Sequence, residues 1–234
     1  MSTVIGVDGC KSGWVTIAGD IDADSVSWCR YTNAWELMRI RPLPMVIAID
    51  IPIGLPLQGP RLCDREARKL IGRGRAGSVF PAPVRPVLDA KGYEDACGIR
   101  LREDGRKMSR QAWGIVHKIR EVDDVLRENL KLQSIMREVH PEVSFFFLAG
   151  QHPMRHSKKT TAGRQERRQL LEPIFGNRLQ EALSERRWLD CAEDDILDAF
   201  AALWTAKRIA SGTARTLPTV PPRDSFGLRM EIVV

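Results

Sequence analysis

Several aspartates of this chain stand among or directly after apolar residues, where a charged group is costly unless it has a partner. Asp8 follows an apolar run at residues 4–7, and Asp50 follows another at residues 45–49. A segment with helical character at residues 192–210 carries further acids, namely Asp194, Asp195 and Asp198. Carboxylate oxygens that converge are hard ligands and suit Mg²⁺ or Mn²⁺. The chemistry to look for is therefore metal-ion chemistry at a cluster of acids.

The first half of the chain contains the strands that must position Asp8 and Asp50. Short β-prone runs at residues 3–8, 13–19 and 25–31 predict an antiparallel meander. A helix is predicted over residues 33–40, with Asn33 as its cap, and a fourth strand begins at Met45. Asp8 and Asp50 then lie at the ends of neighbouring strands, so that both carboxylates can face one end of the sheet.

The composition changes after the fourth strand. Residues 57–135 combine three predicted helices, at 61–71, 93–102 and 109–132, with a loop rich in Gly, Pro and Arg at 73–86. We interpret this segment as a helical insertion within one domain that spans residues 1–234.

The second half should complete the sheet and cover it. The β-prone segment at residues 136–148 is interrupted by Pro141, so a last core strand with an edge position or a bulge near Glu142 is expected. Further helices are predicted at residues 161–171, 177–188 and 192–210, and a short terminal strand at 228–234.

Composition sets broad limits on the function. The chain has 234 residues, 43% of them hydrophobic, and a formal net charge of +6, which favours encounters with polyanions. It has no apolar stretch that would span a bilayer and no secretory signal, so a cytoplasmic protein without membrane contact is expected. The five cysteines are widely scattered and none forms the close pair of a structural zinc site, which argues against zinc and disulfides.

A series of sequence blocks runs in order along the chain: GVDGC at 6–10, AIDIPIGLP at 48–56, SVFPAP at 78–83, EVHPEVSF at 138–145 and DDILDA at 194–199. Together they resemble the DUF429 family, described as predicted RNase H-like nucleases. The resemblance implies an α/β RNase H-like fold, with a mixed five-stranded sheet flanked by helices and its first three strands antiparallel. It also implies an active site on the central strand, with acids supplied by neighbouring elements.

Phosphodiester hydrolysis in such a fold uses two divalent cations about 3.5–4 Å apart, one activating water and one stabilising the leaving oxygen. The hypothesis is that metal ligands come from both strands and from the last helix, namely Asp8, Asp50, Asp195 and Asp198, with Asp8 bridging the ions. Glu142 would be an additional ligand or base. Two alternatives stay open at the helix: Asp195 only caps or solvates its start, or Asp194 is the ligand in its place.

Two basic segments are candidates for contact with a nucleic-acid backbone. One is the loop that contains Arg73, Arg75, Ser78 and Arg85, and the other contains Lys158, Lys159 and Arg164. Contacts with phosphates supply affinity but no sequence specificity, so these residues do not indicate whether the substrate is DNA or RNA. The alternative interpretation is a solvated basic face, which is common for runs of charge.

Two other functions compete with the nuclease. An actin-like or sugar-kinase-like ATP phosphotransferase also begins with an Asp-Gly hairpin, but this chain has no second hairpin of that type and no Walker A sequence. A catalytically silent RNase H-like domain that binds nucleic acid or a protein is the third possibility.

Overall fold

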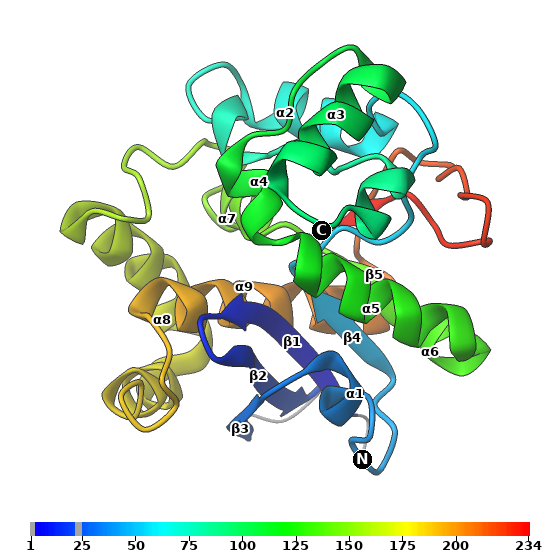
Figure 1. The fold of residues 1–234 in the computed structure, drawn as a ribbon. Helices are drawn as coiled ribbons and strands as arrows, with labels where there is room; N and C mark the ends of the chain where they lie inside the picture. The colour runs from blue at the N-terminus through cyan, green and yellow to red at the C-terminus, as the bar shows by residue number, and fades with distance from the viewer. Residues whose placement is uncertain (1–2, 22–24) are drawn as a thin grey trace.

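A computed structural model describes residues 3–21 and 25–234 of the chain. Its main sheet has the strand order β3-β2-β1-β4-β5, which places β1 at the centre (Figure 1). The bounds are β1 Thr3–Cys10, β2 Gly13–Asp20, β3 Val26–Tyr31, β4 Val46–Ile49 and β5 Met136–Glu138. The first three strands pair antiparallel, and β4 and β5 add parallel to β1. This is the predicted mixed sheet of an α/β RNase H-like fold.

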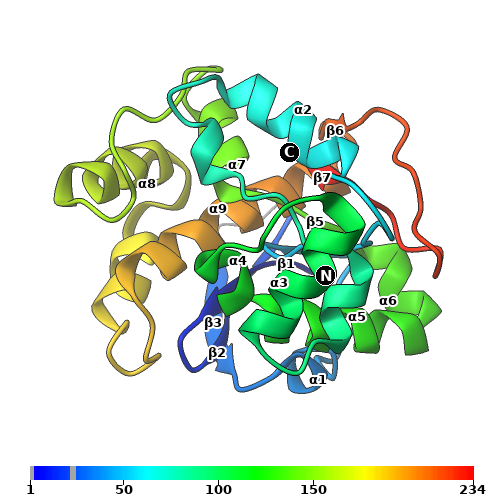
Figure 2. The same cartoon turned by 45° about the horizontal axis from the view of Figure 1, so that its top comes forward.

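Helices cover both faces of this sheet. Helix α9 packs with α8 on one face, and α5 covers the other face together with the short α1 (Figure 1). Helices α2, α3 and α4 lie together beyond one end of the sheet (Figures 1 and 2). The helical bounds are α1 Ala34–Leu37, α2 Leu62–Ile71, α3 Tyr93–Asp104, α4 Arg110–Gly114, α5 Val116–Glu128, α6 Leu130–Ile135, α7 Pro141–Leu148, α8 Thr161–Ser184 and α9 Glu193–Ala210, with 3-10 turns η1 Ala76–Ser78 and η2 Arg85–Asp89.

Alternation along β1 decides which side chains face α9. Val4 packs in the cluster that contains α9, whereas Ile5 and Val7 pack in the cluster that contains α5. Gly6 also faces α9, because a Cβ at this position would lie 2.1 Å from the backbone nitrogen of Leu203. Successive side chains on a strand point to opposite faces. Asp8 therefore faces α9 as well.

The close approach of β1 and α9 predicts a severe effect of Gly6→Ala. The added methyl group would meet backbone atoms of Ala199 and Leu203, which cannot rotate away. We expect the free energy of unfolding, measured by urea titration, to fall by about 3 kcal/mol. Gly19→Ala on β2 is the matched control, because its new contacts begin at 3.4 Å. Equal stability of the two variants would contradict this packing.

The predicted strand segment at residues 136–148 is correct only at its beginning. Residues 136–138 form β5, whereas residues 141–148 form helix α7. Pro141 occupies the first turn of the helix, and the His140 side chain caps it by accepting a hydrogen bond from the backbone N–H of Glu142. A short apolar run that is buried on most sides fits a helix as well as a strand, so its composition did not discriminate. Glu142 thus projects from a helix.

Much of the segment at residues 57–135 belongs to the core. Val116, Ile119 and Val122 of α5 pack against Ile5 and Val7 of the central strand. The single helix expected at residues 109–132 is divided into α4, α5 and α6. At the C-terminus, β7 at Ile232–Val233 pairs with β6 at Thr216–Leu217, so a short terminal strand is present within the predicted range. None of the helices in the described ranges is long and apolar enough to cross a bilayer.

Candidate active site

Asp8 and Asp50 lie side by side on the two central parallel strands. The register pairs Val7 with Ile49, and the backbone N–H of Asp50 donates a 3.0 Å hydrogen bond to the carbonyl of Val7. Both carboxylates therefore belong to one edge of the sheet. Burial raises the pKa of Asp8 well above its ordinary value, and the nearby charges of Asp50, Asp198 and Asp195 raise it further. Acids from three elements thus act on one another here.

Helix α9 supplies Asp198 and Asp195 to this edge. The backbone of Ala199 and Leu203 contacts Gly6, so the preceding turn of the helix lies over Asp8. The Asp198 side chain is only 1% exposed, and burial raises its pKa although Lys158 opposes the shift. Its Oδ1 atom is buried without a hydrogen-bond partner in the described part of the chain. A buried carboxylate oxygen normally has a partner, and water or a cation can supply one here.

The structure separates the roles of Asp194 and Asp195. Asp195 Oδ2 accepts a 2.9 Å hydrogen bond from the backbone N–H of Ala192, so Asp195 does cap the start of α9. Its charge also acts on Asp8, and burial raises its own pKa to about 6. Asp194 instead binds Lys159 at 2.7 Å. Asp195 is therefore both a cap and a member of the acidic site.

A lysine ammonium lies among these acids. Lys158 Nζ is 2.5 Å from Asp198 Oδ2, and the charges of Asp198, Asp8 and Asp50 raise the pKa of Lys158. No set of three or more His, Cys, Asp and Glu side chains in residues 3–21 and 25–234 is spaced to hold a metal ion. The donor chemistry suits a hard cation, and so does the unpartnered oxygen of Asp198. In this structure Asp198 Oδ2 is bound to Lys158, and its Oδ1 is the oxygen left for a cation.

Glu142 joins two arginines next to the acids. Its Oε1 accepts a 2.7 Å hydrogen bond from Arg75, and its Oε2 accepts one of the same length from Arg167. Burial opposes ionisation, but the two arginines bring the pKa of Glu142 below its ordinary value. The Arg167 charge also reaches Asp198. Glu142 therefore orients two arginines in this structure, and its role as a ligand or base stays a prediction.

Comparison with known proteins places the chain in a family. The family model described as "Protein of unknown function (DUF429)" matches residues 6–223. The chain belongs to the DUF429 family. No curated protein and no solved structure matches it. The matched region includes all the acids described above, so the acidic site of this DUF429 protein lies within the part of the chain that defines the family.

The predicted basic segments of the DUF429 protein are partly neutralised by its own acids. Arg164 lies 3.5 Å from Glu193, and Lys158 and Lys159 pair with Asp198 and Asp194. Arg73 is exposed in the loop after α2, whereas Ser78 is half-buried. Contact of these residues with nucleic acid stays a prediction. These ion pairs bring the second segment into contact with α9.

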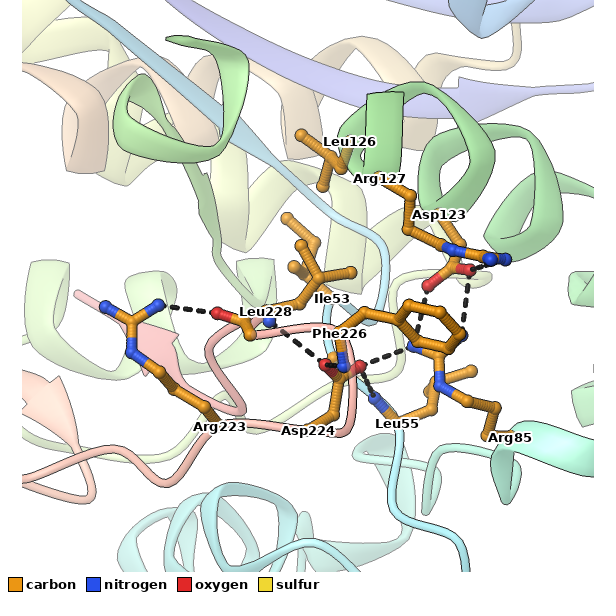
Figure 3. Close-up of polar contacts among 12 residues, drawn as sticks. Ile53, Leu55, Arg85, Asp123, Leu126, Arg127, Arg223, Asp224, Phe226 and Leu228 are labelled. Atoms are coloured by element: carbon orange, nitrogen blue, oxygen red, sulfur yellow. Dashed lines mark hydrogen bonds and ion pairs between the residues drawn. The ribbon is translucent and has the colours of Figure 1, made fainter. Parts of the chain in front are cut away.

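Arg85, the last residue of the predicted phosphate-binding loop, is held by acids of its own chain, and its contact with nucleic acid stays a prediction. It binds Asp123 at 2.8 Å and also binds Asp224 (Figure 3). Asp224 Oδ2 accepts a hydrogen bond from the backbone N–H of Leu55, while Phe226 lies against the Arg85 guanidinium. These contacts tie the C-terminal segment of the DUF429 protein to the loop that follows Asp50. The sequence did not indicate this, because the partners are far apart along the chain.

A second buried ion cluster supports the loop after Asp50. Arg61 lies 2.6 Å from both Asp64 and Glu138, and its side chain is almost fully buried. Arg61 donates to the carbonyl of Ile53, and Glu138 accepts a 2.6 Å hydrogen bond from the backbone N–H of the same residue. Sequence reasoning missed this cluster, and it also missed Arg167. The available signal for Arg167 was its place on one helical face with Leu171 and Phe175.

The fold also brings Cys10 and Cys191 together. A hydrogen bond with Cys191 lowers the pKa of Cys10 to about 6. Ser12 Oγ donates a 3.1 Å hydrogen bond to the carbonyl of Asp190, which holds the turn after β1 against the start of α9. Cys10 is buried, and its environment is polar and adjoins the acids.

Proposed function

We propose that this DUF429 protein is a nuclease that depends on a divalent metal ion and hydrolyses phosphodiester bonds of nucleic acid. The observation that carries the proposal is the gathering of Asp8, Asp50, Asp195 and Asp198 at one sheet edge, with a buried Asp198 oxygen that lacks a partner. Like charges at short range are unfavourable unless a cation offsets them. A bound Mg²⁺ or Mn²⁺ ion would offset the repulsion among these four acids.

The acids have distinct parts in this proposal. A bound Mg²⁺ or Mn²⁺ ion supplies water activation and stabilisation of the leaving oxygen. The charges of Asp50, directly after β4, and of Asp198 on α9 both act on Asp8, so it is the residue best placed to be shared by two ions. Asp195 keeps one oxygen on the backbone of Ala192 and has the other for the site. The strands and α9 fix the carboxylates before substrate arrives, which limits the reorganisation needed.

Arg75 is the residue proposed to hold a phosphate beside the acids, and the buried Arg167 adds positive charge behind it. Arg75 is partly accessible, with 15% of its side chain exposed, and Glu142 fixes its guanidinium. An arginine fork matches phosphate oxygens and gives orientation as well as charge. Arg167 is fully buried, so it contributes to the local potential and does not reach solvent. The net charge of +6 favours a polyanionic substrate in addition.

A cleavage assay with labelled single- and double-stranded DNA and RNA tests the proposal. We expect hydrolysis of at least one substrate with Mn²⁺ or Mg²⁺ and none with EDTA, because the acids alone do not activate water. Binding should weaken steeply over a salt series if phosphates dominate the contact. If EDTA does not change the binding of nucleic acid and no substrate is cleaved, the protein is a catalytically silent binding domain. Thermal stabilisation by ATP, again without cleavage, would favour the phosphotransferase.

A further inference from the structure

We infer that the Lys158 ammonium occupies the cation position of the acidic site in the metal-free protein, and that a divalent ion binds there by displacing it. This inference rests on the proposed metal site and specifies how that site is regulated. It makes Lys158 a built-in competitor of the metal ion.

The contacts of Lys158 match those of a cation held by several acids. Its Nζ atom lies 2.5 Å from Asp198 Oδ2, while Asp8 and Asp50 lie close enough for their charges to act on it. A single ammonium offsets only part of the negative charge, and Asp198 Oδ1 is left without a partner. A divalent ion carries twice the charge and accepts several oxygen ligands. Exchange of the ammonium for the ion therefore improves the charge balance of the site.

Displacement requires a rotation of the side chain and no movement of the backbone. Lys158 lies between α7 and α8, and 37% of its side chain is exposed, so its stem has a route to solvent. The backbone beside it packs closely on α8, because a Cβ at Gly163 would lie 1.9 Å from the carbonyl oxygen of Ser157. Thr160 further anchors the segment by capping α8. A lysine on a flexible stem can leave while this frame remains.

Lys159 is a matched control for Lys158. It is the same residue type in the same segment, and it also makes an ion pair with an acid of α9. Its partner is Asp194, at 2.7 Å, and 72% of its side chain is exposed. Removal of Lys159 changes the net charge by the same amount as removal of Lys158. Only Lys158 contacts Asp198, the acid with the unpartnered buried oxygen.

The test measures Mn²⁺ binding by calorimetry and by the electron paramagnetic resonance signal of free Mn²⁺, after treatment with chelator and dialysis. Lys158→Ala should bind Mn²⁺ about tenfold more tightly than the wild type, whereas Lys159→Ala should stay within about twofold. In the absence of metal, Lys158→Ala should melt at a lower temperature than Lys159→Ala, since several acids lose their counter-charge. Mn²⁺ should then raise the melting temperature of Lys158→Ala more than that of the wild type.

The possible failures are distinguishable. If the wild type binds Mn²⁺ and Lys158→Ala binds it equally or more weakly, the displacement model is overturned while the metal site survives. If neither protein binds Mn²⁺, the proposed metal-dependent function and the displacement model both fail. Asp8→Asn serves to locate the ion, because tight binding that persists in this variant would place the Mn²⁺ outside the acidic site and overturn the inference.

Discussion

Asp8→Asn is expected to abolish metal-dependent cleavage of nucleic acid, with a loss of about a thousandfold or more, while the protein remains folded. Asp8 is the acid on which the charges of Asp50, Asp198 and Asp195 all act, so its carboxylate is the shared member of the proposed ligand set. Asparagine keeps the shape of the side chain but removes one charged ligand oxygen. The measurement is the initial rate of cleavage with saturating Mn²⁺, compared with the wild type.

The same substitution should stabilise the metal-free protein at neutral pH. Burial and neighbouring acids raise the pKa of Asp8 in the folded state above the value of about 3.9 of an unfolded chain. An acid with a raised folded pKa favours folding at low pH, and this contribution is lost as pH rises from the unfolded pKa through the folded one. Asp8→Asn avoids that loss. Urea unfolding in EDTA should therefore show a gain for the variant at pH 7 that disappears near pH 4.

Asp89→Asn is the control for both measurements, because Asp89 is exposed on η2. It should alter neither the cleavage rate nor the pH dependence of unfolding. Cleavage that persists in Asp8→Asn would remove Asp8 from the catalytic centre. A lower free energy of unfolding for Asp8→Asn at pH 7 would contradict the repulsion among these acids.

The sequence predicted the sheet and the acids on it well, for physical reasons. The alternation of apolar residues in β1 and β4 specifies the two faces, and the same parity carries Asp8 and Asp50 onto the α9 side. Proline and glycine mark the ends of these strands. Two acids separated by one helical turn, Asp195 and Asp198, belong to one face of α9. The periodicity of strand and helix was therefore sufficient to predict that these acids lie on the same side of the sheet.

The sequence predicted the partners of charged side chains poorly. Nothing local to Lys158 indicates that it meets Asp198, and nothing local to Arg85 indicates that it meets Asp224. Such pairs depend on how distant elements pack, and long side chains have several reachable partners. The prediction of a strand where α7 forms was wrong for another reason. A short aromatic run that is buried on most sides has no periodicity that distinguishes a helix from a strand. The missed ion pairs and the wrong strand prediction both concern residues around the acids, whereas the aspartates themselves were placed correctly on their elements.

Arg61→Ala is expected to lower the free energy of unfolding by about 3–5 kcal/mol, the largest stability effect that we predict. Arg61 is the common partner of Asp64 and Glu138, and all three side chains are buried. Its removal leaves two carboxylates without a counter-charge in the interior. The loop after Asp50 also loses the hydrogen bond from Arg61 to the carbonyl of Ile53. Urea unfolding at pH 7 measures the loss.

Arg178→Ala is the control, because the ion pair of Arg178 with Glu181 is about half exposed on α8 and should contribute less than about 1 kcal/mol. Simultaneous replacement of Arg61, Asp64 and Glu138 by apolar residues of similar volume should recover much of the stability, since no buried charge then remains unpaired. Recovery of stability without recovery of cleavage would indicate that this cluster also positions Asp50 through the backbone of Ile53. A loss below about 1 kcal/mol in Arg61→Ala would show that water reaches the two carboxylates and that the cluster is not a buried support.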